Sequence, residues 1–181
     1  LQDYIIEDAE LFVSSLSGNR VLDIGCGPGR DMEFLRERGL KVYGMDISST
    51  MCRICKDKGL NILLCDLENL PFRGECFNGI WAYTSLLHIP KVNFKSVLNE
   101  IHGLLGNDGI FYIGMKEGDY EGWKEGKTIE GERRFYSLYK QEELEDILSS
   151  KFEILCSSKI LLGEDGYINY LCRKMLSRNG E

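Results

Sequence analysis

Residues 21–30 read Val21-Leu22-Asp23-Ile24-Gly25-Cys26-Gly27-Pro28-Gly29-Arg30, and this stretch decides the fold. Its first four residues have the branched, apolar character of a buried parallel strand. The three glycines let the backbone turn tightly and approach a ligand closely. A helical pattern follows, so free N–H groups at a helix start would face that ligand. We therefore predict a strand–loop–helix unit that binds a nucleotide-type cofactor.

The glycine spacing argues against a dinucleotide. The dinucleotide fingerprint is G-x-G-x-x-G, whose third glycine lets the helix pack closely on the strand. In this chain Arg30 stands where that third glycine would be. Asp23 lies two residues before the first glycine, where a carboxylate would repel a pyrophosphate but would suit a positively charged cofactor. The pattern Asp-x-Gly-x-Gly-x-Gly resembles motif I of the class I S-adenosylmethionine (SAM) methyltransferases. The resemblance implies SAM as cofactor and S-adenosylhomocysteine (SAH) as product.

The order of predicted elements points to an α/β fold. Strands and helices alternate, which favours a parallel sheet with right-handed crossovers. The expected strands are 21–24, 40–45, 60–64, 76–83, 110–115, 152–159 and 167–173, and the expected helices are 1–16, 30–38, 48–58, one capped by Asn93, and 141–149. A turn is expected at 107–109. The link at 163–166 is too short for a parallel crossover, so the last two strands must be antiparallel. From Asn19 to Lys174 this resembles the doubly wound, seven-stranded methyltransferase fold, with helices on both faces and an antiparallel last strand inserted into the sheet.

Composition bounds the class of protein. The 181 residues are interpreted as one domain, 1–181, with 1–18 as an N-terminal helix. The net charge of −7 weighs against a nucleic-acid partner, which needs a basic stripe. No apolar run approaches the roughly 20 residues of a membrane span, so no membrane partner is expected. The seven cysteines lack regular spacing, which favours reduced thiols and a cytoplasmic location. Cys52-x-x-Cys55 is interpreted as a core-facing pair, and no metal site is predicted.

The cofactor residues are expected where the strands end, because ligands of open α/β sheets bind beyond the carboxyl ends of the strands. Asp46 ends the second strand and can accept two hydrogen bonds from a ribose diol, although an acid there also serves NAD. By resemblance, Asp66 would meet the adenine amino group, with Ile47 and Leu67 packing on the ring. Each acid could instead be an ordinary capping or turn residue. The predicted set is Asp23, Gly25, Cys26, Gly27, Gly29, Asp46, Ile47, Asp66, Leu67 and Tyr83, the last of which is also a plausible core residue.

Methyl transfer asks little of side chains, because the enzyme contributes mainly alignment and exclusion of water. A general base is needed only where the acceptor is protonated. His88 lies on the substrate side of the sheet, yet a structural histidine between Leu87 and Ile89 is the preferred interpretation. His102 lies away from the strand tips. The sequence names no catalytic residue.

Residues 117–137 show no apolar periodicity, and a loop of about 20 residues without a pattern is typical of a lid or of a disordered segment. Tyr120, Trp123, Phe135, Tyr136, Arg133 and Arg134 could wall a pocket for an aromatic or anionic acceptor, with Lys116 nearby, or the segment could be a solvated insertion. A small-molecule acceptor is the favoured prediction. The alternatives are a protein or RNA acceptor with a partner subunit, a catalytically silent SAM-binding protein, and, least favoured, a nicotinamide oxidoreductase.

Overall fold

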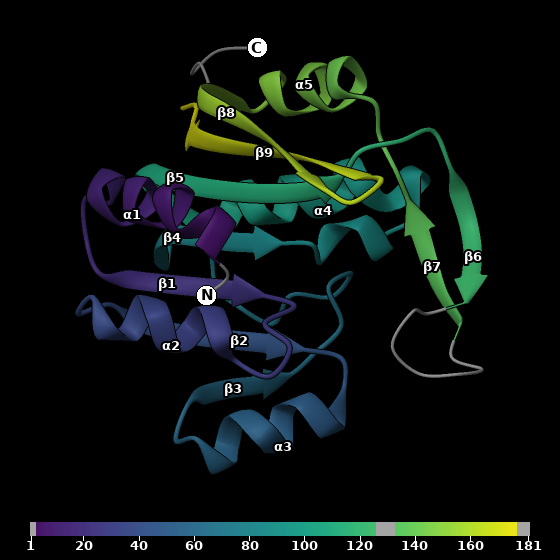
Figure 1. Ribbon diagram of the computed structural model, residues 1–181. Coiled ribbons are helices and arrows are strands. Elements are labelled where there is room, and N and C mark those ends of the chain that lie inside the picture. Colours follow the sequence, from purple (N-terminus) through teal and green to yellow (C-terminus); the bar gives the residue numbers. More distant parts are fainter. Residues whose placement is uncertain (1–2, 126–132, 177–181) are drawn as a thin grey trace.

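The computed structural model describes residues 3–125 and 133–176, and its centre is a seven-stranded sheet in the order β3-β2-β1-β4-β5-β9-β8 (Figure 1). Neighbouring strands from β3 to β5 are parallel, whereas β9 is antiparallel to both β5 and β8. The last strand therefore inserts into the sheet, as predicted. The strands are β1 Arg20–Ile24, β2 Lys41–Asp46, β3 Asn61–Leu64, β4 Phe77–Tyr83, β5 Leu105–Lys116, β8 Phe152–Leu162 and β9 Asp165–Lys174.

Helices cover both faces of the sheet. The 3-10 helix η1 (Asp3–Ile5) with α1 (Ile6–Ser15), α2 (Arg30–Glu37) and α3 (Ser49–Asp57) pack on one face, and α4 (Lys91–Leu104) and α5 (Gln141–Ser149) on the other. A short 3-10 helix, η2 (Leu86–His88), follows β4. Ser48 caps α3, because its hydroxyl accepts from the Met51 N–H at 3.4 Å.

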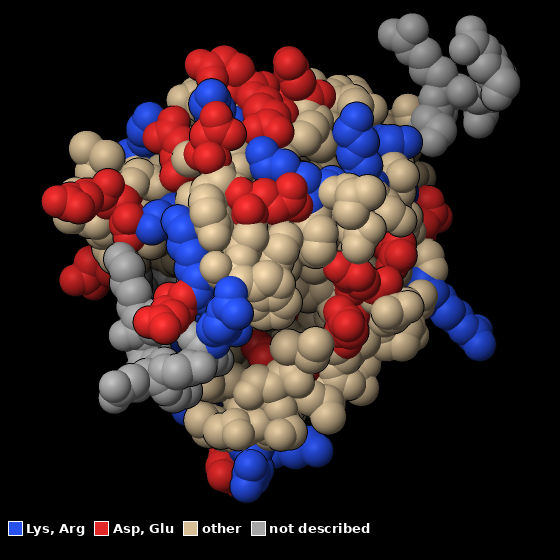
Figure 2. All heavy atoms as spheres, turned by 90° about the vertical axis from the view of Figure 1, so that its right-hand side faces the viewer, with Lys and Arg blue, Asp and Glu red and all other residues tan. Residues whose placement is uncertain are grey.

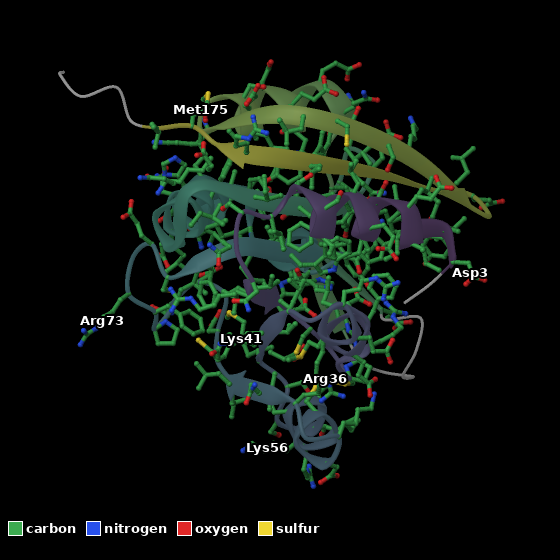
Figure 3. The ribbon with its side chains drawn as sticks, turned by 90° about the vertical axis from the view of Figure 1, so that its left-hand side faces the viewer. Asp3, Arg36, Lys41, Lys56, Arg73 and Met175 are labelled. Carbon is green, nitrogen blue, oxygen red and sulfur yellow. The ribbon has the colours of Figure 1, made fainter. Side chains whose placement is uncertain are left out.

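The two cores follow from strand alternation. In β1, Val21 faces α1 and α2, whereas Leu22 and Ile24 face α4. On the α1 side, the Trp81 ring stacks on Tyr112 with centroids 3.9 Å apart. Figure 3 looks from the side opposite the strand tips and shows side chains filling the space between sheet and helices, while labelled Arg73 and Lys56 point outward.

Two predicted boundaries are wrong. Asn93 does not cap α4, because the helix begins at Lys91 after Pro90, and the Asn93 amide instead donates to the Glu68 carboxylate at 3.2 Å. Residues 107–109 do not precede the fifth strand but lie inside β5. The turn-like composition marks a local irregularity there: Asp108 has φ +56°, and the pairing register shifts between Phe77 and Gly79.

The expectation that residues 117–137 lack secondary structure is also wrong. The described parts form a separate antiparallel pair, β6 (Glu121–Glu125) with β7 (Arg133–Ser137). The central part, 126–132, lies outside the described residues. The sequence concealed these strands because Gly122 and charged residues dilute their alternation, while Trp123 and Phe135 pack edge to face at 5.6 Å only after the strands pair.

None of the helices formed by the described residues combines the length and the apolar character needed to cross a membrane.

Candidate functional site

The predicted cofactor residues converge at the carboxyl ends of the central strands. The glycine loop follows β1, Asp46 ends β2 and Tyr83 ends β4. These strands are neighbours in the sheet, so their ends share one edge. Figure 2 faces this edge and shows lysine and arginine side chains gathered to the left of its centre.

The glycine loop requires glycine for different reasons at different positions. Gly25, Gly27 and Gly29 have φ values of +68°, +55° and +81°, which disfavour other residues. A Cβ at Gly25 would lie 2.4 Å from the Ser85 Cβ, and one at Gly29 would lie 2.4 Å from Leu60 Cδ1. A Cβ at Gly27 would meet nothing within 4 Å. Gly27 therefore borders open space, as expected of a backbone cradle for a ligand.

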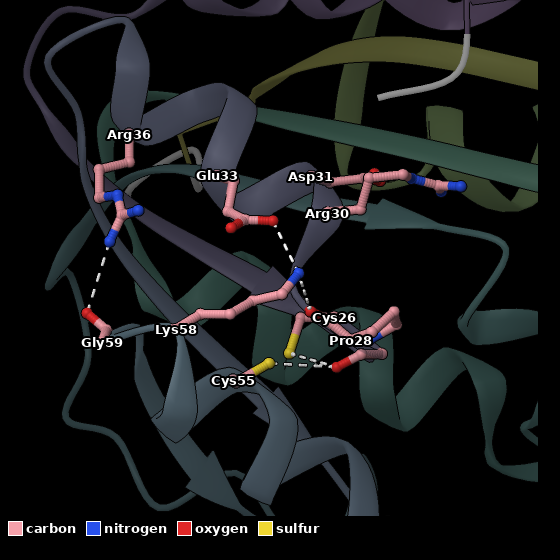
Figure 4. Close-up of polar contacts among 10 residues, drawn as sticks. Cys26, Pro28, Arg30, Asp31, Glu33, Arg36, Cys55, Lys58 and Gly59 are labelled. Carbon is pink, nitrogen blue, oxygen red and sulfur yellow. Dashed lines mark hydrogen bonds and ion pairs between the residues drawn. The ribbon is translucent and has the colours of Figure 1, made fainter.

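The back of the loop is fixed by its neighbours. The N–H groups of Gly25 and Cys26 both donate to the Met45 carbonyl, at 2.8 and 3.1 Å. The Cys55 thiol of α3 donates to the Gly27 carbonyl at 3.2 Å, and the ammonium of Lys58, which follows α3, donates to the Pro28 carbonyl at 3.0 Å (Figure 4). Burial raises the pKa of the Cys26 thiol, so this side chain stays protonated and is not a nucleophile.

Asp46 joins the loop to the end of β2. One carboxylate oxygen accepts from the Gly27 N–H at 2.9 Å and the other from the Ser48 N–H at 2.8 Å. Because a carboxylate has about four lone-pair sites, each oxygen retains the capacity for one more donor. This geometry suits an acceptor for two adjacent hydroxyls.

Asp23 is buried inside β1, and its Oδ2 has no hydrogen-bond partner among the described residues. Burial, followed by the charges of Asp31 and Asp46, raises the pKa of Asp23 well above its usual range, whereas Arg30 opposes this shift. A ligand with positive charge would favour the ionised carboxylate. A buried acid with one unsatisfied carboxylate oxygen, beside an open glycine cradle, fits a cationic, ribose-bearing cofactor such as SAM.

Sequence reasoning missed Asp31, a third acid close to the glycine loop. It is buried in the first turn of α2, where its Oδ2 accepts from the Trp81 indole N–H at 3.1 Å and its Oδ1 from Arg30 Nε at 3.0 Å. An acid in a first helical turn is common on solvent-facing helices. Only the hydrogen bond from Trp81, which is distant in the sequence, distinguishes Asp31 from such an acid.

The remaining predicted contacts surround the loop with different degrees of burial. Ile47 has 69% of its surface exposed beyond β2, and Tyr83 is buried. Asp66 is exposed and accepts from the Glu68 N–H at 3.0 Å, while Leu67 packs partly on the core. The turn bond of Asp66 agrees with the alternative interpretation of this acid, so its contact with adenine stays a prediction, as does that of Ile47.

A cavity of about 490 Å³ lies beside this edge. Its walls come from η1, the start of α2, the ends of β4 and β5, η2, the β6–β7 pair and the start of β9. It is lined by Tyr4, Arg30, Tyr83, Thr84, Leu87, His88, Lys116, Lys124, Glu125, Arg134, Tyr136, Leu138, Asp165 and Tyr167. Of the residues expected to wall an acceptor pocket, Arg134, Tyr136 and Lys116 do so, whereas Trp123 is 58% exposed.

The two histidines lie in different environments. His88 reaches the cavity, and its Nδ1–H donates to the Phe135 carbonyl at 2.7 Å, with the Tyr136 ring edge-on at 4.9 Å. His102 is bound to the Met175 carbonyl at 2.8 Å on the far end of α4, as a structural residue would be. The Cys52 and Cys55 thiols are buried, as predicted, and donate to main-chain carbonyls.

A doubly wound sheet with a glycine loop and a strand-end acid defines a nucleotide-cofactor-binding α/β protein. Comparison with known proteins narrows this class: the "Methyltransferase domain" family model matches residues 21–109, which hold the loop, Asp46 and β4. This match and the methyltransferase relatives described below support a class I SAM-dependent methyltransferase, with SAM as its cofactor.

The chain is also similar in sequence to individual proteins. An uncharacterised protein of Methanocaldococcus jannaschii, MJ1252, is 29% identical over 167 residues, covering 76% of this chain and 63% of that protein. Malonyl-[acyl-carrier protein] O-methyltransferase of Salmonella typhimurium is 37% identical over 107 residues, covering 56% and 42%. The chain therefore spans less than two thirds of these relatives.

Among solved structures, a similar fold occurs in 1,6-didemethyltoxoflavin-N1-methyltransferase of Burkholderia thailandensis, with a TM-score of 0.77 at 23% identity. The match covers 95% of this chain and 78% of that one, which was solved with 1,6-didemethyltoxoflavin and S-adenosylhomocysteine bound. This likeness confirms the predicted fold.

Proposed function

We propose that this chain transfers a methyl group from SAM to a small-molecule acceptor. One observation carries the proposal: the open glycine cradle and the Asp46 carboxylate lie at the same sheet edge as a cavity of about 490 Å³. Small-molecule sites typically have volumes of roughly 300–1,000 Å³. The Burkholderia structure, which holds the small molecule 1,6-didemethyltoxoflavin beside S-adenosylhomocysteine, supports the same assignment.

The residues divide into binding and enclosing roles. Bound SAM supplies an electrophilic methyl group on a positively charged sulfur. Asp46 would hold the ribose hydroxyls, Asp23 would offset positive charge, and Tyr83 and Thr84 would separate the cofactor from the acceptor. The β6–β7 pair and η1 wall the cavity, which limits water around the reacting atoms. A carboxylate or a neutral amine acceptor needs no base, so the reaction does not require His88 in every case.

A macromolecule-borne acceptor is the second candidate. The Salmonella relative is named for a substrate carried on acyl-carrier protein. This name supports an acceptor that a partner protein presents to the present site. The cavity would then receive only the tip of the carried group.

The cytoplasmic location stays a prediction from the cysteines, all seven of which are free thiols.

Isothermal titration of one preparation with SAM, SAH and NAD tests the proposal. We expect saturable binding of both adenosyl ligands, none of NAD, and weakening by Asp46→Ala of at least about tenfold, since two hydrogen bonds to a charged group are lost. Turnover of SAM to SAH with small acceptors, without any carrier, separates the enzyme from a silent SAM-binding protein. Absence of binding by either adenosyl ligand would contradict the proposal.

A further inference from the structure

The helix α3 contacts both segments that form the expected cofactor site. The Cys55 thiol donates to the Gly27 carbonyl of the glycine loop at 3.2 Å, and the Cys52 thiol donates to the main-chain carbonyl of Asp46 at 3.5 Å. The two cysteines are three residues apart, so they lie on the same side of the helix. The Cys-x-x-Cys motif therefore lies behind the site, with each thiol bound to its main chain.

Lys58 adds a charged donor at the end of this helix. Its ammonium donates to the Pro28 carbonyl at 3.0 Å and pairs with the Glu33 carboxylate of α2 at 2.8 Å (Figure 4). A hydrogen bond with an ionised donor is stronger than one between neutral groups, whereas a thiol is a weak donor. We therefore expect Lys58 to contribute more than Cys55 to the position of the loop.

The glycine loop does little to fix its own conformation. Gly27 and Gly29 both have positive φ values, and glycine has more conformational freedom than any other residue. The Gly29 N–H donates to the Cys26 carbonyl at 3.1 Å, which closes one turn of the loop. The carbonyls of Gly27 and Pro28 are held from outside the loop, by α3 and the residue that follows it. These outside bonds reduce the number of conformations that the loop can adopt.

The bonds lie on the closed side of the loop. A Cβ at Gly27 would meet nothing within 4 Å, so the loop is open there, whereas a Cβ at Gly29 would lie 3.0 Å from the Cys55 Sγ. The open side is therefore left to a ligand, and the donors act on the loop from elsewhere. A loop that is already held in its binding conformation loses less conformational entropy when a ligand binds.

We propose that Lys58 and Cys55 are positioning residues for SAM. They act through the glycine loop: by holding the carbonyls of Gly27 and Pro28, they keep the cradle in the conformation that binds the cofactor. This inference rests on the proposed function, because it concerns the affinity for the same cofactor. A purely structural role would change the stability of the whole chain and leave the affinity for the cofactor unaltered.

The test compares SAH affinity by isothermal titration in variants of the full chain. Lys58→Met keeps an unbranched apolar side chain but removes the ammonium. It should raise the Kd for SAH about threefold or more, because a smaller fraction of the unbound chain would hold the binding conformation. Lys58→Arg keeps a charged donor and should restore most of the affinity. Glu33→Gln is the matched control, since it removes the ion pair but leaves the Pro28 carbonyl its donor, and its Kd should stay within about twofold of the wild type.

Two further measurements separate positioning from stability. Cys55→Ala, which removes the thiol donor, should weaken SAH binding more than Cys55→Ser, which keeps a donor. In the unliganded chain, the Gly29 N–H should exchange with solvent faster in Lys58→Met than in the wild type, while the free energy of unfolding in urea changes little. The Lys58 side chain is 35% exposed, so its replacement leaves the core intact.

The outcomes distinguish the two proposals. Wild-type affinity for SAH in Lys58→Met would overturn the role of Lys58, and wild-type affinity in Cys55→Ala would overturn that of Cys55. An equal loss of affinity in Glu33→Gln would overturn the proposal by assigning the effect to the ion pair between the two helices. Failure of SAH to bind the wild-type chain would instead contradict the proposed function, and the exchange of the Gly29 N–H would still decide whether Lys58 holds the loop.

Discussion

Replacing Gly27 by alanine tests whether this residue is glycine because a ligand lies against it or only because its backbone conformation is strained for other residues. At φ +55° an L-residue in the left-handed region destabilises the folded state by about 1–2 kcal/mol. Alanine also reduces the conformational entropy of the unfolded chain, which offsets this loss by about 0.4–1 kcal/mol. The free energy of unfolding of the Gly27→Ala variant should therefore be lower than that of the wild type by about 1 kcal/mol. The added Cβ meets no protein atom within 4 Å, so no clash adds to this loss.

The decisive expectation concerns binding. The new methyl group would occupy the open space beside the loop, so Gly27→Ala should raise the Kd for SAH at least tenfold, or about 1.4 kcal/mol. Gly39→Ala is the matched control, because Gly39 has φ +82°, also meets nothing within 4 Å, and follows the far end of α2. Urea unfolding and isothermal titration measure the two effects. Wild-type SAH affinity in Gly27→Ala, or an equal loss in Gly39→Ala, would refute the assignment of the cradle.

Three further perturbations test the acids. Asp23→Asn should weaken SAH binding yet stabilise the protein at neutral pH. The folded-state pKa of Asp23 lies above the unfolded value, so the stability of the wild type falls as the pH rises between the two values. In urea titrations at several pH values, the stability gain of the variant should therefore vanish below about pH 4. A gain that persists in acid would contradict this. Asp66→Ala should lower affinity for SAH but not for S-inosylhomocysteine, which lacks the adenine amino group; equal losses would indicate a turn-stabilising role only. Asp8→Ala should cost about 1–3 kcal/mol in urea unfolding, because Asp8 accepts from the Tyr112 and Ser158 hydroxyls at 2.8 and 2.7 Å, and SAH affinity should change little.

Much of the fold was predictable from local patterns. The glycine loop, the strand-end Asp46 and the antiparallel ending all depend on short-range signals: a tight turn, a period of side chains, or a link too short to cross over. The predicted element boundaries were wrong where the local composition favoured one structure and the tertiary contacts favoured another. Asn93 looks like a cap but serves Glu68, and residues 107–109 look like a turn but continue β5.

By itself, the sequence indicated the methyltransferase class, the order of the elements of the main sheet, and the edge of the sheet at which a cofactor is expected, because these follow from residues adjacent in the chain. Only the tertiary structure decided which distant side chains meet. Trp81 meets Asp31, His88 meets the Phe135 carbonyl, and Lys124 faces Arg134 across a hairpin that has no local signature. Such contacts depend on how strands pair and helices pack, and these choices minimise the energy of the whole chain rather than that of any segment.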